Sequence, residues 1–144
     1  MKVHIRHSDF IDLDDILKLH KTSLPHLKWS YNRKYIEEVL RGKDNSECFS
    51  LIGEDKFIGF LHLYLEKDYL WLNTIAVDPL YRGLGCGRKL IQFAEAHGID
   101  LEYPIIKLWT SLKQSESHLK YYEDMGYVRF GRDKKWQGLK KVLV

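Results

Sequence analysis

The sequence predicts one α/β domain of three layers, in which helices flank a mixed, mainly antiparallel central sheet. Three observations support this fold class. The length of 144 residues suits a single domain with a single core. Segments with the two-residue period of strands alternate with segments of helical period. The expected order is β-α-α-β-β-β-α-β-α-β-β with no repeat or linker, so we expect residues 1–144 to form one domain.

The N-terminal segment shows one short strand and two helices. Residues 3–5 alternate between apolar and polar side chains, as in a strand. Over residues 9–20 apolar side chains recur at helical spacing, with acidic residues in the first turn. Pro25 ends this pattern, so residues 21–30 are expected to form a loop. A second helix is expected over residues 32–41, with a glycine directly after it.

Three strands are expected next. Residues 48–52 form the first, and an acidic pair marks the turn after it. Residues 57–65 alternate cleanly, with Gly59 as a candidate bulge. Residues 70–77 are nearly all apolar, which predicts a strand buried on both faces.

The second half begins with a glycine-rich loop after Asp78 and Pro79, and then returns to alternating helices and strands. Its expected elements are a helix over residues 87–97 stopped by Gly98, a strand over 105–110, a helix over 116–125 followed by Gly126, and strands over 127–130 and 139–144 joined by a charged turn around Trp136.

Composition argues against several classes of protein. The net charge is only +3 and no basic stripe is evident, so nucleic acid is not an expected partner. No stretch approaches the ~18 apolar residues of a membrane span, and no signal peptide is evident. Cys48 and Cys86 are too far apart for a CxxC motif, which favours a reduced, cytoplasmic setting. The histidines form no HExxH or HxH cluster, so no metal is expected.

The most informative segment is the loop Arg82-Gly-Leu-Gly-Cys-Gly-Arg88, which joins an apolar strand to a helix. Its alternate glycines allow a ligand to approach the backbone, and the unpaired amides of a helix N-terminus attract anions. The two arginines add charge that can pair with phosphate. The segment lacks the GK[ST] ending of a P-loop and the third glycine of a Rossmann fingerprint. A plain strand-to-helix turn is the alternative interpretation.

This segment and a later one resemble the GNAT family of N-acetyltransferases. The family signature [RQ]-x-x-G-x-[GA] is present as Arg82-Gly-Leu-Gly85-Cys-Gly87, preceded by Ile75-Ala-Val-Asp-Pro-Leu-Tyr. The family's second motif, Y-x-x-x-G-[FY], is present as Tyr122-Glu-Asp-Met-Gly126-Tyr127. The element order agrees over essentially the whole chain.

The resemblance implies that acetyl-CoA is the co-substrate and that a primary amine is the acceptor, with no metal. It implies that the two strands at residues 70–77 and 105–110 separate and hold the pantetheine arm between them. The implied cofactor-binding residues are Ile75, Ala76 and Val77 for that arm, and Arg82, Gly83, Leu84, Gly85, Cys86, Gly87 and Arg88 for the pyrophosphate.

The resemblance also implies that Tyr122 protonates the departing thiolate, since phenol and thiol pKa values lie within about two units of each other. Its neighbour Tyr121 is the second candidate, and a packing role for Tyr122 remains an alternative. Many relatives carry a basic glutamate near the position of Asn73. An amide cannot accept a proton, so two alternatives remain for deprotonation of the amine. The proton passes through water to Glu54, His62 or Glu66, or the amine arrives already neutral and needs no base.

Acceptor selection in such folds usually falls to the loop after the first helix and to the last hairpin turn. These segments contain His26, Lys28, Trp29, Tyr31, Lys134, Lys135 and Trp136. An aromatic, mildly basic pocket would suit an amine that also bears a carboxylate, or a protein amino group. A non-catalytic acyl-CoA-binding module is the alternative function, and the sequence leaves a monomer or a homodimer open.

Overall fold

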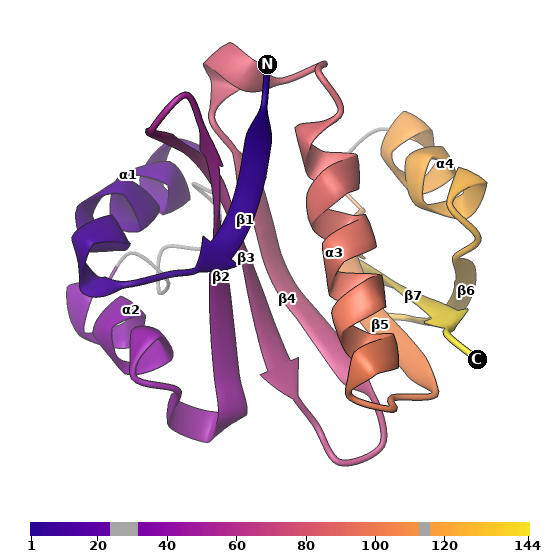
Figure 1. The fold of residues 1–144 in the computed structure, drawn as a ribbon. Coiled ribbons are helices and arrows are strands. Elements are labelled where there is room, and N and C mark those ends of the chain that lie inside the picture. The colour runs from indigo at the N-terminus through magenta and orange to yellow at the C-terminus, as the bar shows by residue number, and fades with distance from the viewer. Residues whose placement is uncertain (24–31, 113–115) are drawn as a thin grey trace.

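The computed structural model describes residues 1–23, 32–112 and 116–144. Helices lie on both faces of one continuous sheet (Figure 1). The strands are β1 (Val3–His7), β2 (Ser46–Gly53), β3 (Lys56–Leu65), β4 (Leu70–Val77), β5 (Ile105–Ser111), β6 (Val128–Arg132) and β7 (Trp136–Val142), and the α-helices are α1 (Leu13–Ser23), α2 (Arg33–Leu40), α3 (Cys86–Asp100) and α4 (Glu116–Asp124).

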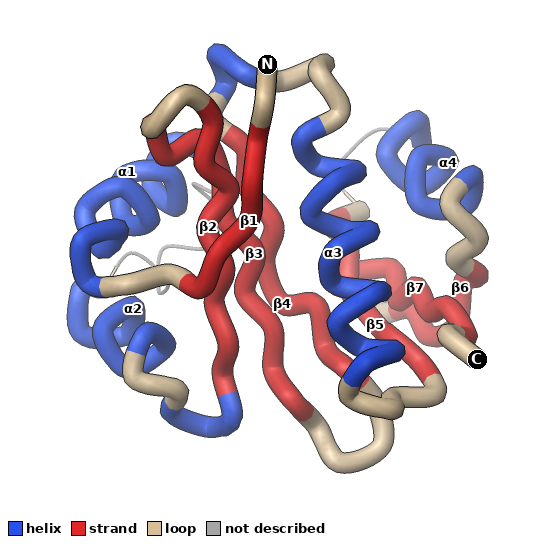
Figure 2. Tube along the Cα trace, in the orientation of Figure 1, coloured by secondary structure: helices blue, strands red, loops and turns tan. Residues whose placement is uncertain are grey.

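The sheet has seven strands in the order β1-β2-β3-β4-β5-β7-β6. Every neighbouring pair is antiparallel except β4 and β5, which run parallel and are connected through α3. Figure 2 shows α1 and α2 on one side of the strands and α3 and α4 on the other. The prediction of a three-layer domain with a mixed, mainly antiparallel sheet is therefore confirmed.

A buried carboxylate attaches the first helical segment to the sheet. Asp12 is only 3% exposed, and the Arg6 guanidinium donates two hydrogen bonds to it, at 2.7 and 2.9 Å. The Ser50 hydroxyl donates a third at 3.0 Å, and the Asp9 N–H a fourth at 2.9 Å. Burial by itself would raise the pKa of Asp12, but these hydrogen bonds outweigh it, so the pKa is lowered. β1, β2 and the start of α1 are thereby joined.

Two apolar clusters lie on opposite faces of the sheet. Leu90, Ile91 and Ala94 of α3 pack with β-strand residues such as Leu61 and Leu108 in the larger cluster. The smaller cluster holds α1 and α2 against the other face, with these members: Leu13, Ile16, Leu19, Ile36, Val39, Cys48, Phe60 and Ala76. Alternation along each strand thus supplies both cores.

A bulge at Asn73 exchanges the faces of β4. In the pairing with β3, His62 lies opposite Thr74 but Leu63 lies opposite Leu72, so Asn73 is the extra residue. Leu72 before the bulge belongs to the α3-side cluster, whereas Ala76 after it belongs to the α1–α2 cluster. The strand therefore alternates between buried and half-buried residues, and the expectation of burial on both faces is wrong.

Three boundary predictions also need correction. Helix α3 continues through Gly98 to Asp100. Gly98 is needed there for packing, since a Cβ would lie 2.8 Å from Leu143 Cδ1 and 3.1 Å from Leu70 Cδ2. Helix α1 extends to Ser23, into the expected loop. Trp136 is the first residue of β7 and pairs with Ser111 instead of lying in a turn.

The β2–β3 pairing contains a bulge next to Gly59, and its extra residue is Ile58. At Gly59 itself, β3 and β4 approach each other closely. A Cβ at Gly59 would lie 2.7 Å from the Ala76 carbonyl oxygen, which is backbone and cannot move aside. We expect Gly59→Ala to lower the free energy of unfolding by about 1–3 kcal/mol, the usual cost of overpacking. Thermal or urea unfolding measures this.

The control is Gly131→Ala, because a Cβ there meets Trp109 at an ordinary 3.5 Å. It should change the free energy of unfolding by less than about 0.5 kcal/mol. Equal unfolding midpoints for the two variants would contradict the proposed contact.

Candidate functional site

The site begins where β4 and β5 stop pairing. The parallel ladder runs only from Leu70 opposite Ile106 to Leu72 opposite Leu108. Beyond this point β4 stays paired with β3 as far as Val77, while β5 stays paired with β7 as far as Ser111. The edge of β4 that faces β5 therefore keeps N–H and C=O groups without a strand partner in the described sheet. An extended ligand can be bound there.

The glycine loop stands at the end of β4, on the same side of the sheet as α3. Gly83 and Gly85 have φ angles of +78° and +81°, which non-glycine residues rarely adopt. Gly85 is the N-cap of α3 and has no side chain with which to cap it. The first amides of α3 are consequently available to an anion, at the positive end of a 15-residue helix.

A cavity of about 340 Å³ opens at this loop. Seven of the ten predicted cofactor-binding residues line it, together with two tyrosines that were not predicted as cofactor-binding residues. Its lining consists of Val77, Tyr81, Arg82, Gly83, Gly85, Cys86, Gly87, Arg88 and Tyr121. The loop and its two arginines thus surround one recess, as the phosphate-site prediction requires.

The other three predicted residues lie outside this lining. Leu84 is 61% exposed at the tip of the loop, so its backbone rather than its side chain is the group to consider. Ile75 and Ala76 lie on β4 between the bulge and Val77, where the strand faces the separation from β5. A role for them in binding therefore concerns their backbone groups.

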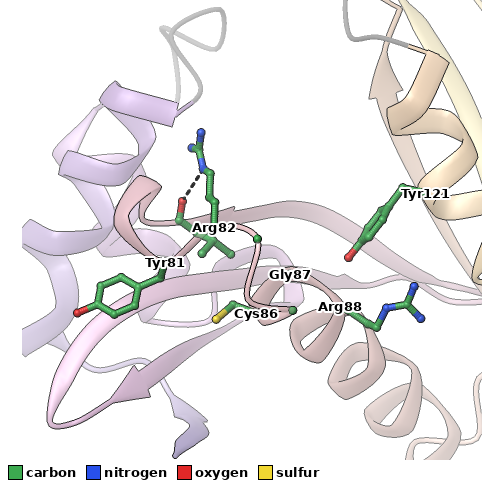
Figure 3. A pocket seen from close by; sticks show the side chains of 9 residues that line it. Tyr81, Arg82, Cys86, Gly87, Arg88 and Tyr121 are labelled. Carbon is green, nitrogen blue, oxygen red and sulfur yellow. Dashed lines mark hydrogen bonds between the residues drawn. The ribbon is translucent and has the colours of Figure 1, made fainter. Parts of the chain in front are cut away.

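The arginines shape the two sides of the recess. Arg82 Nε donates to the Val77 carbonyl at 3.2 Å, which attaches the loop to the end of β4 (Figure 3). The Arg88 guanidinium lies 5.8 Å from the ring centroid of Tyr121 on α4. Figure 3 shows Tyr121 reaching from α4 toward the start of α3. A Cβ on Gly87 would lie 3.7 Å from the Tyr121 hydroxyl.

Tyr122, the predicted acid, is buried beside this recess rather than in its lining. It is 7% exposed and packs in the α3-side cluster, with ring centroids 5.7 Å from Tyr127 and 5.6 Å from His118. Burial, and then the proximity of Tyr121, raises its pKa well above the ordinary value of a phenol. Its hydroxyl therefore keeps its proton at neutral pH.

Tyr121 is the more exposed neighbour. Burial raises its pKa as well, partly offset by the positive charge of Arg88. Its position at the cavity could not be read from helical spacing alone, since the phase of α4 relative to α3 is set by packing. Tyr81 was missed although it precedes Arg82 in the family signature.

A polar network surrounds the bulge on the α1–α2 side. The Asn73 amide lies 3.3 Å from His62 Nδ1, and His62 Nε2 lies 3.2 Å from the Ser46 hydroxyl. The hydroxyls of Tyr35 and Tyr64 lie 3.0 Å apart beside them. Burial, and then the nearby His20, lowers the pKa of His62 to about 3, so the imidazole is neutral and weakly basic at neutral pH.

The other candidate bases lie in turns. Glu54 is in the turn before β3 and Glu66 in the turn after it, about 30 Å apart along a ten-residue strand. At most one of these two carboxylates could therefore act as the base at a single site. Of the predicted acceptor-binding residues, Lys134 and Lys135 lie in the turn before β7, and Trp136 begins it. His26, Lys28, Trp29 and Tyr31 lie outside the described residues.

Across residues 1–23, 32–112 and 116–144 there is no group of three or more His, Cys, Asp or Glu side chains placed to hold a metal ion. Within the same ranges no helix is both long and apolar enough to cross a bilayer. Cys48 and Cys86 are both buried free thiols.

Comparisons with solved structures show the same fold. The PaiA N-acetyltransferase of Thermoplasma acidophilum, solved with coenzyme A, has a TM-score of 0.88 at 16% identity, covering 99% of each chain. Ard1 of Thermoplasma volcanium has a TM-score of 0.86 at 16% identity, over 100% of this chain and 99% of that one. The ribosomal-protein-S18-alanine N-acetyltransferase of Escherichia coli has a TM-score of 0.84 at 17% identity, covering 99% of this chain and 94% of that one.

At such identities these likenesses concern the fold. A search of curated proteins finds no match. The model of the acetyltransferase (GNAT) family matches residues 13–127, which contain the glycine loop, the separated strands and both tyrosines of α4. The chain belongs to the GNAT family of acetyltransferases.

Proposed function

We propose that the protein transfers an acetyl group from acetyl-CoA to a primary amine of a small molecule or a protein, by direct attack within a ternary complex. One observation carries this proposal. The part of β4 beyond the end of the β4–β5 ladder leads directly into the loop at the open N-terminus of α3. An extended arm along β4 and a pyrophosphate at the loop would therefore be bound as one continuous ligand.

The residues present fit that ligand. Peptide groups of Ile75, Ala76 and Val77 would pair with the amides of the pantetheine arm, as a neighbouring strand would. The backbone N–H groups from Leu84 to Arg88 would donate hydrogen bonds to the pyrophosphate oxygens, and the side chains of Arg82 and Arg88 add charge. The open space beside Gly83 and Gly85, where a Cβ would meet nothing within 4 Å, permits such an approach. Coenzyme A in the solved Thermoplasma acidophilum PaiA supports the choice of cofactor.

Acetyl-CoA supplies an activated thioester, and two tasks remain for the chain. A proton must reach the departing sulfur, and we assign this to the Tyr122 hydroxyl because of its motif position; burial raises its pKa and so makes it a weaker acid than a free phenol. An amide N–H must stabilise the carbonyl oxygen, and a backbone N–H left out of the ladder by the bulge at Asn73 would serve next to the separation. No residue is assigned as the base, since Asn73 cannot accept a proton.

The first prediction concerns cofactor binding. CoA and acetyl-CoA should raise the melting temperature, because a ligand bound only by the folded state stabilises it by mass action. A concentration of 100 Kd would add about 2.7 kcal/mol. Differential scanning fluorimetry measures this, with ATP and NAD as controls that lack a pantetheine arm. Equal stabilisation by ATP would contradict the assignment to CoA, whereas CoA binding without turnover of any amine would favour an acyl-CoA-binding module.

The second prediction concerns the loop. Gly87 has an ordinary helical φ and faces the cavity, so Gly87→Val should fold normally yet obstruct the pyrophosphate. We expect at least a tenfold loss of CoA affinity by calorimetry, which corresponds to about 1.4 kcal/mol. Gly87→Ala is the matched control and should lose much less. Gly85→Val should also weaken binding, but it adds backbone strain at φ +81°. Unchanged CoA affinity in a folded Gly87→Val variant would mean that the glycines only form a strand-to-helix turn and do not bind the pyrophosphate.

The third prediction separates the two tyrosines of α4. Tyr122→Phe removes one oxygen and retains the ring that packs against Tyr127, so thermal melts should change little. Turnover should fall by roughly 10²–10⁴-fold, with a smaller effect on the KM for acetyl-CoA. Tyr121→Phe is the matched control and should lower turnover only slightly. Full activity in Tyr122→Phe would refute its role, and a loss confined to Tyr121→Phe would transfer the role to Tyr121.

A further inference from the structure

Four aromatic side chains form a strip on the sheet face opposite α3. They are Tyr69, Trp71, Trp109 and Phe130, and successive ring centroids are 6.2, 6.3 and 5.5 Å apart. Leu108, next to Trp109 in β5, packs toward α3, so alternation turns Trp109 to the other face. Trp109 is 37% exposed and the other three are half-buried. This aromatic strip is therefore accessible to a ligand.

Two glycines allow the rings to lie on the sheet. A Cβ on Gly138 of β7 would lie 2.8 Å from the Phe130 ring, and a Cβ on Gly131 of β6 would lie 3.5 Å from Trp109. A side chain in place of Gly138 would push the Phe130 ring away from the strands, whereas a Cβ at Gly131 would make only an ordinary contact with Trp109. Neighbouring rings are inclined to one another by 54–71°, so the strip presents both ring faces and ring edges to a ligand.

Two lysines stand over the aromatic strip. Lys107 Nζ lies 4.4 Å from the ring centroid of Tyr69 and 5.3 Å from that of Phe130, and Lys140 Nζ lies 5.9 Å from that of Phe130. Lys107 and Lys140 are direct cross-strand partners in the β5–β7 ladder. Like charges in such a pair are destabilising. In the part of the chain that the structure describes, neither lysine has a carboxylate within ion-pair distance. A ligand with a negative charge would relieve the repulsion.

The two middle rings of the aromatic strip lie near the proposed reaction centre. Trp71 precedes the bulge residue Asn73 by two positions, and Trp109 follows Leu108, the last β5 residue paired with β4. Lys107 pairs with Trp71, which lies two residues, or about 7 Å along β4, from the bulge, and the Lys107 ammonium lies over Tyr69. In a free amino acid the carboxylate lies only about 3 Å from the amine. A carboxylate on the second or third residue of an extended peptide spans the required distance.

We propose that the aromatic strip with Lys107 and Lys140 binds the acceptor, and that the acceptor is a peptide amino terminus followed by an acidic residue at its second or third position. An apolar part of the peptide lies on the rings, and the carboxylate lies between the two lysines. This inference rests on the proposed transferase function, because it deepens the identity of the amine.

The test uses amidated pentapeptides that begin with alanine, carry Glu, Gln or Arg at position 2 or 3, and contain one phenylalanine. Binding is measured by calorimetry with the enzyme–CoA complex, which cannot turn over, and acetylation is measured by mass spectrometry with acetyl-CoA. The Glu peptides should bind and react about tenfold better than the Gln peptides, the ratio expected for one partly exposed charge-assisted contact.

Variants identify the surface. Lys107→Gln with Lys140→Gln should bring the Glu-to-Gln ratio close to one, and Lys107→Glu should shift the preference toward the Arg peptides. Lys56→Gln, an exposed lysine at the start of β3, is the matched control and should keep the ratio.

Three results would overturn the inference: equal binding of the Glu and Gln peptides, a preference that survives in the double variant, or a concentration-dependent dimer that Trp109→Ser abolishes. Acetylation without the preference would leave the transferase function standing and remove only this inference. Preferential binding without acetylation would support the peptide-binding surface and contradict the transferase function, because the calorimetric readout does not depend on turnover.

Discussion

The architecture of the site depends on one constraint, namely that β4 pairs fully with β3 but only briefly with β5. The ladder to β5 ends at Leu72 and Leu108, one residue before the bulge at Asn73. The bulge keeps β4 attached to β3 while it exchanges which side chains face which core. A sheet that continued to pair with β5 would satisfy its own backbone groups and leave nothing for an extended ligand. The binding edge therefore exists because regular pairing stops.

The glycine loop forms a cavity only because the rest of the fold places α4 beside it. Glu95 of α3 accepts from the Tyr127 hydroxyl at 2.8 Å and from Lys141 Nζ at 3.2 Å. These contacts join α3 to β7 and to the end of α4. Tyr121 can then face the loop while Tyr122 packs beneath it. The glycine loop, Tyr122 and the free edge of β4 are thus brought together around α3.

The opposite side of the sheet has a different character. Near the bulge it is closed by α1 and α2 and holds a buried polar network around His62. Farther along β5 and β7 it presents half-exposed rings and two lysines that have no carboxylate partner among the described residues. An approaching amine and a bound thioester would therefore come from opposite faces of the sheet and meet where β4 and β5 separate. This division would allow a small domain to hold two substrates, one on each face of its sheet.

The sequence by itself determined the order of elements, the glycine loop and the tyrosine motif, because each rests on local rules. Alternation, helix ends and positive-φ glycines involve only near neighbours along the chain. It also led to Gly98 as a helix stop and to Trp136 as a turn residue, and both expectations failed. Gly98 lies within a helix because Leu70 and Leu143 pack against it, and Trp136 is drawn into β7 by pairing with Ser111.

Only the tertiary structure decided where β4 and β5 separate, which tyrosine of α4 faces the cavity, and that Lys107 meets Lys140 over a row of rings. Tyr121 and Tyr122 are adjacent in sequence, and the helical period alone cannot say which one points to α3. Strand register and helix phase are set by contacts between segments far apart in the chain. No local pattern carries that information, so these features of the site could not be read from the sequence.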